Sequence, residues 1–192
     1  MPNVPVTRRS FAAGFAALPI GLALSAQSAA AAADSGAAQM DAAQGLSHSS
    51  AAIHQELLFK ASRRRVYRLL TDAVEFDAVT RLSDAITLVT APNARATTIS
   101  RHVGGSFTLF GGYITGRHLD MVPDERLVQA WRAGSWPTGE YSIVNFALLE
   151  AREGCRLAFN HRGFPDSEGS SLAYGWRVHY WDPMAKRLAQ SP

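Results

Sequence analysis

The chain has 192 residues, 47% of them hydrophobic, with 19 basic and 16 acidic residues and a formal net charge of +3. That length accommodates one domain with a sizeable core. A single cysteine, Cys155, excludes a disulfide within the chain, so packing must hold the fold together.

The charge gives no support for nucleic-acid binding. Residues 1–30 contain two arginines and no acidic residue, so the remainder carries 17 basic and 16 acidic residues. Such a balance lacks the basic surface that binds phosphate backbones, and we expect no nucleic acid among the partners. We interpret the arginines at 63–65 and 68 as a solvated helix face, with a phosphate or anionic-lipid patch as the alternative.

The first 30 residues have the pattern of an export signal. Arg8 and Arg9 are followed by an uncharged apolar run from Phe11 to Leu24 and then by small residues. The paired arginines fit the twin-arginine signal, which a receptor of the export machinery reads. The apolar run has 14 residues, fewer than the roughly 20 that span a bilayer.

Cleavage after this signal would release the rest of the chain beyond the membrane. We expect residues 1–30 to be removed, and the mature protein to be periplasmic or otherwise exported and not membrane-anchored. An ordinary secretory signal or an uncleaved anchor is the alternative. Residues 31–51 are rich in alanine, serine and glycine and are predicted to form a disordered tether.

The folded domain is predicted to begin with a strand and two short helices. Alternating apolar residues mark the strand at Ile53–Lys60. Ser62 is a suitable N-cap for the first helix, although three arginines in its first turn oppose the helix dipole. The second helix is expected at Ala73–Val79, with Phe76 and Val79 facing inward.

Short β-type runs separated by glycine and proline fill the middle of the chain. The breaks occur where tight turns need a positive or fixed φ, which predicts antiparallel hairpins. The predicted strands are Ala85–Val89, Thr97–Val103, Ser106–Phe110, Tyr113–Val122, Leu127–Arg132, Tyr141–Leu149 and Arg156–His161. Together with the first strand, they make a sheet long enough to curl.

An amphipathic helix is predicted over residues 171–188. Large apolar residues recur there at intervals of four, beginning with Leu172. Ser170 or Ser171 can cap its start. Pro183 cannot donate to the carbonyl four residues earlier, which predicts either a kink or a restart of the helix with Asp182 as a new cap.

Several segments resemble one known family. They are ASRRRVYRLLTD, GGSFTLFGGYITGRHLDMVPDERLVQAWR, SWPTGEYSIVNFAL, CRLAFNHRGFP and GWRVHYWDPM. Over residues 52–188 the chain resembles the family named after the C-terminal domain of the activator of Hsp90 ATPase, in its bacterial branch, within the START-like (SRPBCC) superfamily. The resemblance implies an α+β helix-grip fold over residues 52–190. In that fold, a curved antiparallel sheet of six to eight strands packs on a long C-terminal helix, with two short helices after the first strand.

A sheet that grips a helix can enclose a ligand, and this chain is rich in aromatic residues. The residues predicted to line such a cavity are Phe107, Trp131, Phe146, Phe159, His161, Trp176 and Tyr180. Filling the core is the alternative role for the same side chains. His161 is expected to face inward, either as a proton donor or acceptor toward a bound carbonyl or as a hydrogen-bonded core histidine.

Motifs for catalysis or cofactor binding do not stand out in the sequence. The glycine pairs lack the lysine and hydroxyl residue of a phosphate loop, no G-x-S-x-G elbow occurs, and the histidines lack close ligand spacing. We therefore expect no metal and no cofactor. The superfamily includes lipid carriers, hormone receptors, polyketide cyclases and hydrolases, so the resemblance alone does not choose an activity.

Three functions fit these observations. The first is an exported protein that binds a small apolar or aromatic molecule between the sheet and the C-terminal helix. The second is a cyclase- or hydrolase-like enzyme that uses the same cavity. The third is a co-chaperone-like protein-interaction module, which the family name suggests, although export would separate it from a cytosolic chaperone.

Overall fold

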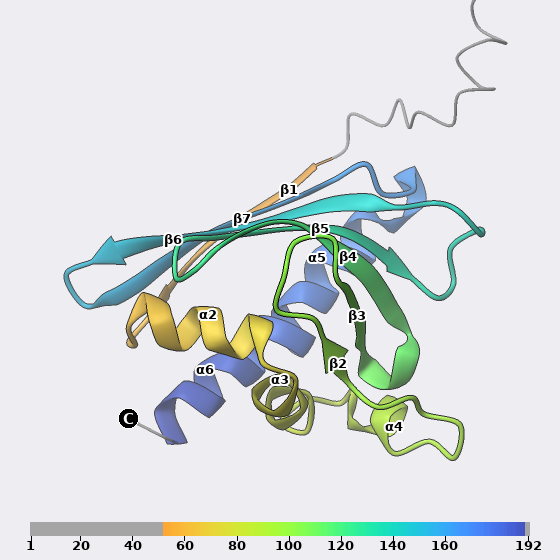
Figure 1. Ribbon diagram of the computed structural model, residues 1–192, viewed down its shortest axis with the longest axis horizontal. Coiled ribbons are helices and arrows are strands. Elements are labelled where there is room, and N and C mark those ends of the chain that lie inside the picture. The colour runs from red at the N-terminus through yellow and green to blue at the C-terminus, as the bar shows by residue number, and fades with distance from the viewer. Residues whose placement is uncertain (1–51, 191–192) are drawn as a thin grey trace, which may run out of the picture. The chain divides into compact units, whose positions relative to one another are not determined.

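Seven antiparallel strands form one curved sheet in the computed structural model, which describes residues 52–190 (Figure 1). The strands are β1 (Ala52–Phe59), β2 (Thr98–Ile99), β3 (Ser106–Leu109), β4 (Ile114–Val122), β5 (Arg126–Ala133), β6 (Ser142–Ala151) and β7 (Gly154–Arg162). Their order across the sheet is β1-β7-β6-β5-β4-β3-β2. The predicted signal peptide with Arg8 and Arg9 and the predicted tether lie outside the described residues.

One face of the sheet is apolar because successive side chains of a strand point to opposite faces. Every second side chain of β5 is buried, including Leu127 and Trp131, and β6 repeats this pattern through Phe146. β1 pairs with β7 along its length, with Ile53 opposite His161. This architecture confirms the predicted α+β helix-grip fold, and the number of strands falls within the expected six to eight.

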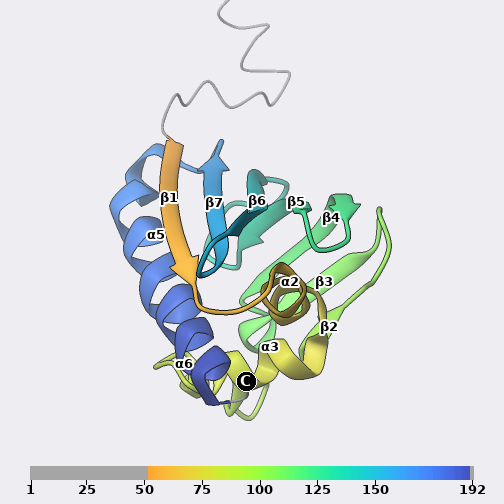
Figure 2. The same cartoon turned by 90° about the vertical axis from the view of Figure 1, so that its left-hand side faces the viewer.

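Two short helices follow β1, as predicted, and lie on the same face of the sheet as the C-terminal helices (Figures 1 and 2). They are α2 (Arg63–Thr71) and α3 (Ala73–Thr80). Ser62 caps α2 by accepting a hydrogen bond from the backbone N–H of Arg65. Phe76 and Val79 of α3 are fully buried, which confirms their predicted inward orientation.

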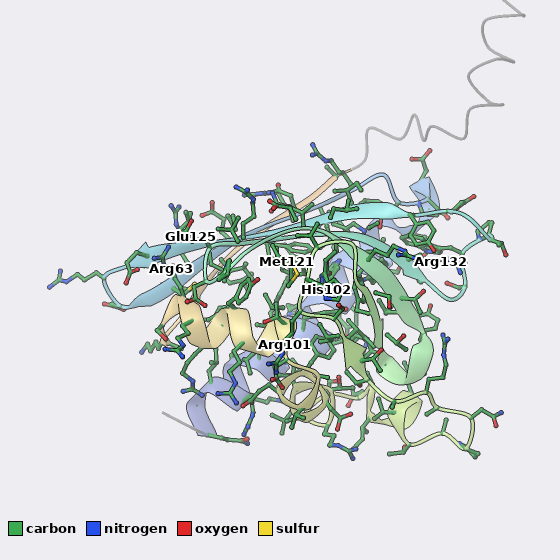
Figure 3. All side chains as sticks on the ribbon, viewed as in Figure 1. Arg63, Arg101, His102, Met121, Glu125 and Arg132 are labelled. Atoms are coloured by element: carbon green, nitrogen blue, oxygen red, sulfur yellow. The ribbon has the colours of Figure 1, made fainter. Side chains whose placement is uncertain are left out.

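Carboxylates from other elements pair with two arginines of α2. Arg63 forms ion pairs with Glu150 at 3.0 Å and with Glu125 at 3.8 Å, and Figure 3 shows Arg63 beside Glu125. Arg68 pairs with Glu75 at 3.3 Å. Glu150 and Glu125 offset part of the unfavourable interaction between Arg63 and the positive end of the helix dipole, whereas Arg68 lies in the last turn of α2, where the dipole favours a cation.

The last helical run crosses the inner face of the sheet (Figure 2). It comprises α5 (Gly169–Gly175), the π-helical segment η3 (Trp176–Trp181) and α6 (Asp182–Gln190). The predicted N-cap at Ser170 or Ser171 is wrong. The run begins earlier, directly after a 3₁₀ turn, and the Ser171 hydroxyl donates back to the carbonyl of Glu168.

A π-helical turn precedes Pro183 in this run. Asp182 has helical dihedral angles (φ −63°, ψ −44°), so it is not a new N-cap and the predicted restart is wrong. The N–H of Asp182 instead donates to the carbonyl of Arg177, five residues earlier. In a regular α-helix, Pro183 would remove a hydrogen bond and crowd the carbonyl of His179, and the wider turn accommodates the proline.

A short helix, α4 (Ile86–Val89), replaces the strand predicted at Ala85–Val89. The apolar and β-branched residues there favour a strand, but no part of this segment joins the sheet. A turn of helix satisfies its backbone locally, since the Thr90 N–H donates to the Ile86 carbonyl at 3.0 Å.

The strand predicted at Thr97–Val103 is shortened to Thr98–Ile99, which is β2. The chain turns directly after it, and the N–H of Gly105 donates to the carbonyl of His102. The remaining predicted strands are confirmed, with ends that differ by at most two residues.

Candidate ligand pocket

A pocket of about 220 Å³ lies between the sheet and the C-terminal helical run. β4 and β5 form its floor, and α4 and the 3₁₀ turn η1 (Phe110–Gly112) close one side. The lining is mostly apolar. It consists of Ala85, Leu88, Phe110, Tyr113, Ile114, Trp131, Ala133, Glu168, Ser171, Leu172, Gly175, Trp176, His179 and Tyr180.

Three of the seven predicted cavity residues line this pocket: Trp131, Trp176 and Tyr180. Trp131 comes from β5, while the other two come from η3. Their rings are close, with centroids 4.2 Å apart between Trp176 and Tyr180 and 5.6 Å apart between Trp131 and Trp176. The sheet and the helix therefore supply an aromatic wall jointly.

The other four predicted residues do not line this pocket. Phe107, Phe146, Phe159 and His161 are at most 1% exposed and belong to the packed core. Phe146 and Phe159 contact each other and Trp176, with ring centroids 4.5–5.9 Å apart. These four side chains are packed in the space between sheet and helix, which is the core-filling role that the sequence left as the alternative.

The hydrogen bonds of His161 fix its tautomer. Ser142 has one hydroxyl proton, which it donates to the carbonyl of Trp131 at 2.9 Å. Nε2 of His161, 2.7 Å from the Ser142 oxygen, must therefore donate to it. Nδ1 then accepts from the indole N–H of Trp176 at 3.0 Å. His161 is the hydrogen-bonded core histidine of the two predicted alternatives.

Burial reinforces this neutral state. Desolvation lowers the pKa of His161 from its ordinary value of 6.5 to about 3. The proton that would charge the ring would have to enter between Nδ1 and the Trp176 N–H, which already point at each other. His161 thus has neither access to the pocket nor a free nitrogen with which to act as an acid or a base.

Three polar atoms of pocket-lining residues are buried without a hydrogen-bond partner: Nε1 of Trp131, the hydroxyl of Tyr180 and Nδ1 of His179. Burial raises the pKa of Tyr180, so its hydroxyl stays protonated. Burial also lowers the pKa of His179, and the carboxylate of Asp84 opposes only part of that shift. All three groups are therefore neutral at pH 7.

Several lining residues were not identified from the sequence. Glu168, Ser171, Leu172, Gly175 and His179 follow the three- and four-residue spacing of one helix face, which was a usable signal. The sequence around Phe110 gave a weaker indication that this residue lines a pocket. Phe110 begins a run of three residues with positive φ, at 49°, 66° and 97°, where the sequence indicated only a glycine-rich turn.

Arg117 of β4 and Arg132 of β5 do not bring their charges to this pocket, although both strands contribute to it. Arg132 donates to the carbonyls of Trp136 and Pro137 in the loop after β5 (Figure 3), and Arg117 donates to the carbonyl of Gly104. Neither is among the residues that line the pocket.

Residues 52–190 contain neither a metal-binding cluster nor a helix suited to span a membrane. In this part of the chain, no group of three or more His, Cys, Asp or Glu side chains is arranged to hold a metal ion. The helices described here include none with the length and apolarity needed to cross a bilayer.

The fold is shared with solved structures. An HSP90 activator from Plasmodium falciparum aligns with a TM-score of 0.58 and 22% sequence identity, covering 72% of this chain and 95% of that chain. At this identity the likeness establishes the fold alone.

Sequence comparison identifies curated relatives that are considerably longer. The activator of 90 kDa heat shock protein ATPase homolog 1 of Homo sapiens is 28% identical over 95 residues, which are 50% of this chain and 28% of the relative. An uncharacterized protein of Schizosaccharomyces pombe is 36% identical over 80 residues, which are 42% of this chain and 24% of the relative. The chain thus matches only about a quarter of each relative's length. The sequence model of the Activator of Hsp90 ATPase homolog 1-like protein family matches residues 60–189, and the chain therefore belongs to this family.

Proposed function

We propose that this chain is an exported protein that binds a small apolar or aromatic molecule between its sheet and its C-terminal helical run. The pocket carries this proposal. It has a volume of about 220 Å³, a mostly apolar lining and an aromatic wall made by Trp131, Trp176 and Tyr180. Concave sites with these properties are the usual sites of small-molecule binding.

The enzymatic alternative needs an acid or base in the cavity, a role that His161 or a nearby tyrosine or arginine could take. That histidine does not line the pocket, and both of its ring nitrogens are engaged by Ser142 and Trp176. A binding role needs neither a free base nor a nucleophile. Binding is therefore the function that the geometry favours.

The binding proposal is tested first on the protein isolated from its own cells. Native mass spectrometry and solvent extraction should reveal a co-purifying small molecule. The same protein, once stripped of that molecule, should bind ethylbenzene in an NMR titration. If no species is bound and ethylbenzene causes no saturable shifts, the protein is not a carrier of apolar molecules.

A pocket-filling variant connects binding to this site. Ala133 is buried in the pocket wall, so Ala133→Leu extends a side chain into the space that the ligand would occupy. Ala147→Leu makes the same change at a half-buried position on the opposite face of the sheet. We expect only Ala133→Leu to lose ethylbenzene binding while its circular dichroism spectrum remains that of the wild type. Equal loss in both variants would place binding elsewhere.

A co-chaperone role is the second candidate, and it is favoured by the names of the curated relatives. The chain matches 28% of the length of the human protein, so that activity cannot be transferred as a whole. Adding the purified chain to an Hsp90 and measuring ATP hydrolysis tests the idea directly. A rate that rises saturably with the concentration of the chain supports this role, and an unchanged rate contradicts it.

A further inference from the structure

Residues that line the pocket carry buried hydrogen-bonding groups that no other group of the described residues pairs with. Trp131 and Tyr180 are 3% and 5% exposed, yet Nε1 of the indole and the phenolic oxygen lack hydrogen-bond partners. Nδ1 of His179, from the same helical segment as Tyr180, is also buried and unpaired. Most buried polar groups in proteins are paired, so a cluster of exceptions at one pocket needs a physical explanation.

The chemistry of the first two groups indicates what is missing. An indole N–H can only donate. The indole N–H of Trp131 lies near enough to the phenolic oxygen of Tyr180 to favour the deprotonated form of the phenol. The two groups nevertheless do not meet the geometry of a hydrogen bond. The lone pairs of Tyr180 thus face one donor, and its hydroxyl proton is left for an acceptor. Among the described residues, no side chain or carbonyl accepts that proton.

The charge of the lining restricts this acceptor further. Glu168 contributes a carboxylate to the lining, and none of the described residues that line the pocket is a lysine or an arginine. A buried anion without a positive partner is strongly unfavourable, and Glu168 would repel it. The acceptor must therefore belong to a neutral molecule.

Size and shape complete the description. A cavity of about 150 Å³ is known to hold benzene, so a pocket of about 220 Å³ holds one ring with substituents. The rings of Phe110, Trp131, Trp176 and Tyr180 provide flat apolar surfaces on which such a ring can stack.

We propose that this pocket binds a neutral ring-bearing molecule whose carbonyl oxygen accepts the hydroxyl proton of Tyr180, with the ring packed against Trp131 and Trp176. This inference rests on the proposed binding function and names the chemical class of its ligand. A ligand carbonyl would complete a chain of polar contacts from the Trp131 indole through the Tyr180 hydroxyl.

The test uses three one-ring probes on the full chain: acetophenone has a neutral carbonyl, ethylbenzene has no acceptor, and benzoate is an anion. Tyr180→Phe removes only the hydroxyl, so comparing each probe between the two proteins cancels the desolvation of the probe. We expect Tyr180→Phe to raise the dissociation constant of acetophenone about threefold to tenfold, as a lost hydrogen bond would. The dissociation constant of ethylbenzene should stay unchanged or fall. Tyr174→Phe is the matched control, since Tyr174 belongs to the same helical run, is 59% exposed and does not line the pocket.

A second measurement reports on the hydrogen bond directly and does not rely on dissociation constants. The carbonyl stretching frequency of bound acetophenone should lie below its value in hexane, as hydrogen bonding requires, and should return toward that value in Tyr180→Phe. Three results would each overturn the inference while leaving apolar binding intact. Tyr180→Phe could change the dissociation constants of acetophenone and ethylbenzene equally, the carbonyl of bound acetophenone could absorb at its hexane frequency, or benzoate could bind more tightly than acetophenone. If none of the three probes binds, the proposed function fails with it.

Discussion

The indole N–H of Trp176 donates a 3.0 Å hydrogen bond to Nδ1 of His161 in the core. The helix thereby assigns the tautomer of a histidine on β7, and the Ser142 hydroxyl on β6 accepts from the other nitrogen. Three elements that are distant in sequence are held together by this short chain of hydrogen bonds. Several properties of the protein depend on it.

Stability should fall as the pH is lowered below about 6.5. The folded pKa of His161 is about 3, against an ordinary value of 6.5, so between these values the unfolded chain binds a proton that the folded protein excludes. At pH 5 this single group should cost about 2 kcal/mol of unfolding free energy relative to pH 7. Urea denaturation at both pH values measures the loss.

The variant His161→Gln isolates this contribution, because it removes the titrating group while His118 and His179 remain. Its unfolding free energy should be lower than that of the wild type at pH 7, and the gap should narrow by about 2 kcal/mol at pH 5. A gap that stays constant between pH 7 and pH 5 would show that His161 titrates normally in the folded protein.

Removing the hydroxyl that joins β5, β6 and β7 should be costly despite the small change in volume. Ser142→Ala leaves the Nε2–H of His161 without its acceptor in the core and removes a donor to the carbonyl of Trp131, a residue that is also paired with Ser142 in the β5–β6 ladder. The unpaired buried N–H should reduce the unfolding free energy by about 1 to 3 kcal/mol. Ser170→Ala, at an exposed position of α5, is the control and should change it by less than about 0.5 kcal/mol. Similar values for both variants in urea denaturation would contradict this account.

The wall formed by α4 depends on a glycine at its point of closest approach. Gly111 has φ +66°, and a Cβ there would lie 2.2 Å from the backbone oxygen of Leu88. Gly139 also has a positive φ, of +91°, but a Cβ there meets nothing within 4 Å. Gly139→Ala should therefore cost about 1 to 2 kcal/mol from backbone strain alone. Gly111→Ala should lose about 1 to 3 kcal/mol more, because α4 must move.

The two glycine variants also separate stability from the shape of the pocket. Since Leu88 lines the pocket, Gly111→Ala should weaken ethylbenzene binding, whereas Gly139→Ala should not. Thermal unfolding and an NMR titration measure the two effects. Unchanged binding in Gly111→Ala would mean that α4 does not shape the site.

Export should require both arginines of the signal and not merely their charge. A reporter fused to residues 1–33 should leave the cytoplasm, and changing Arg8 and Arg9 to lysine should retain it there. The lysines preserve the positive charge that an ordinary secretory signal needs. Cell fractionation measures the distribution, and undiminished export of the lysine variant would exclude the twin-arginine route.

Most of the fold could be predicted from local sequence patterns. Short β-type runs between glycine and proline breaks identified β5, β6 and β7, and Ser62 marked the start of α2. The strand predicted at Ala85–Val89 was wrong because a strand-like composition carries no information on whether a neighbouring strand is available. Of the two outcomes expected at Pro183, a kink or a restart of the helix, the restart was wrong for a related reason, since a local rule does not reveal that a π-helical turn accommodates the proline.

The candidate site could be predicted only in part from the sequence. The sequence identified aromatic residues that face inward, because period-two alternation gives the face of a strand. It did not separate Trp131, which lines the pocket, from Phe146 and Phe159, which fill the core. An inward-facing side chain of the sheet lines a pocket only where the packed helical run leaves space opposite it. The helical run therefore decides which of these residues line the pocket and which fill the core.

The sequence by itself determined most of the strands and helices and the apolar inner face, because these depend on residue types at short and regular spacings, and its resemblance to known sequences indicated the family. Only the tertiary structure decided that His161 is a neutral core histidine and that Tyr180 keeps an unpaired hydroxyl at a pocket. Both outcomes depend on partners from other segments, such as Ser142 and Trp131 for these two residues, and the burial that sets their protonation exists only once the helical run has packed on the sheet.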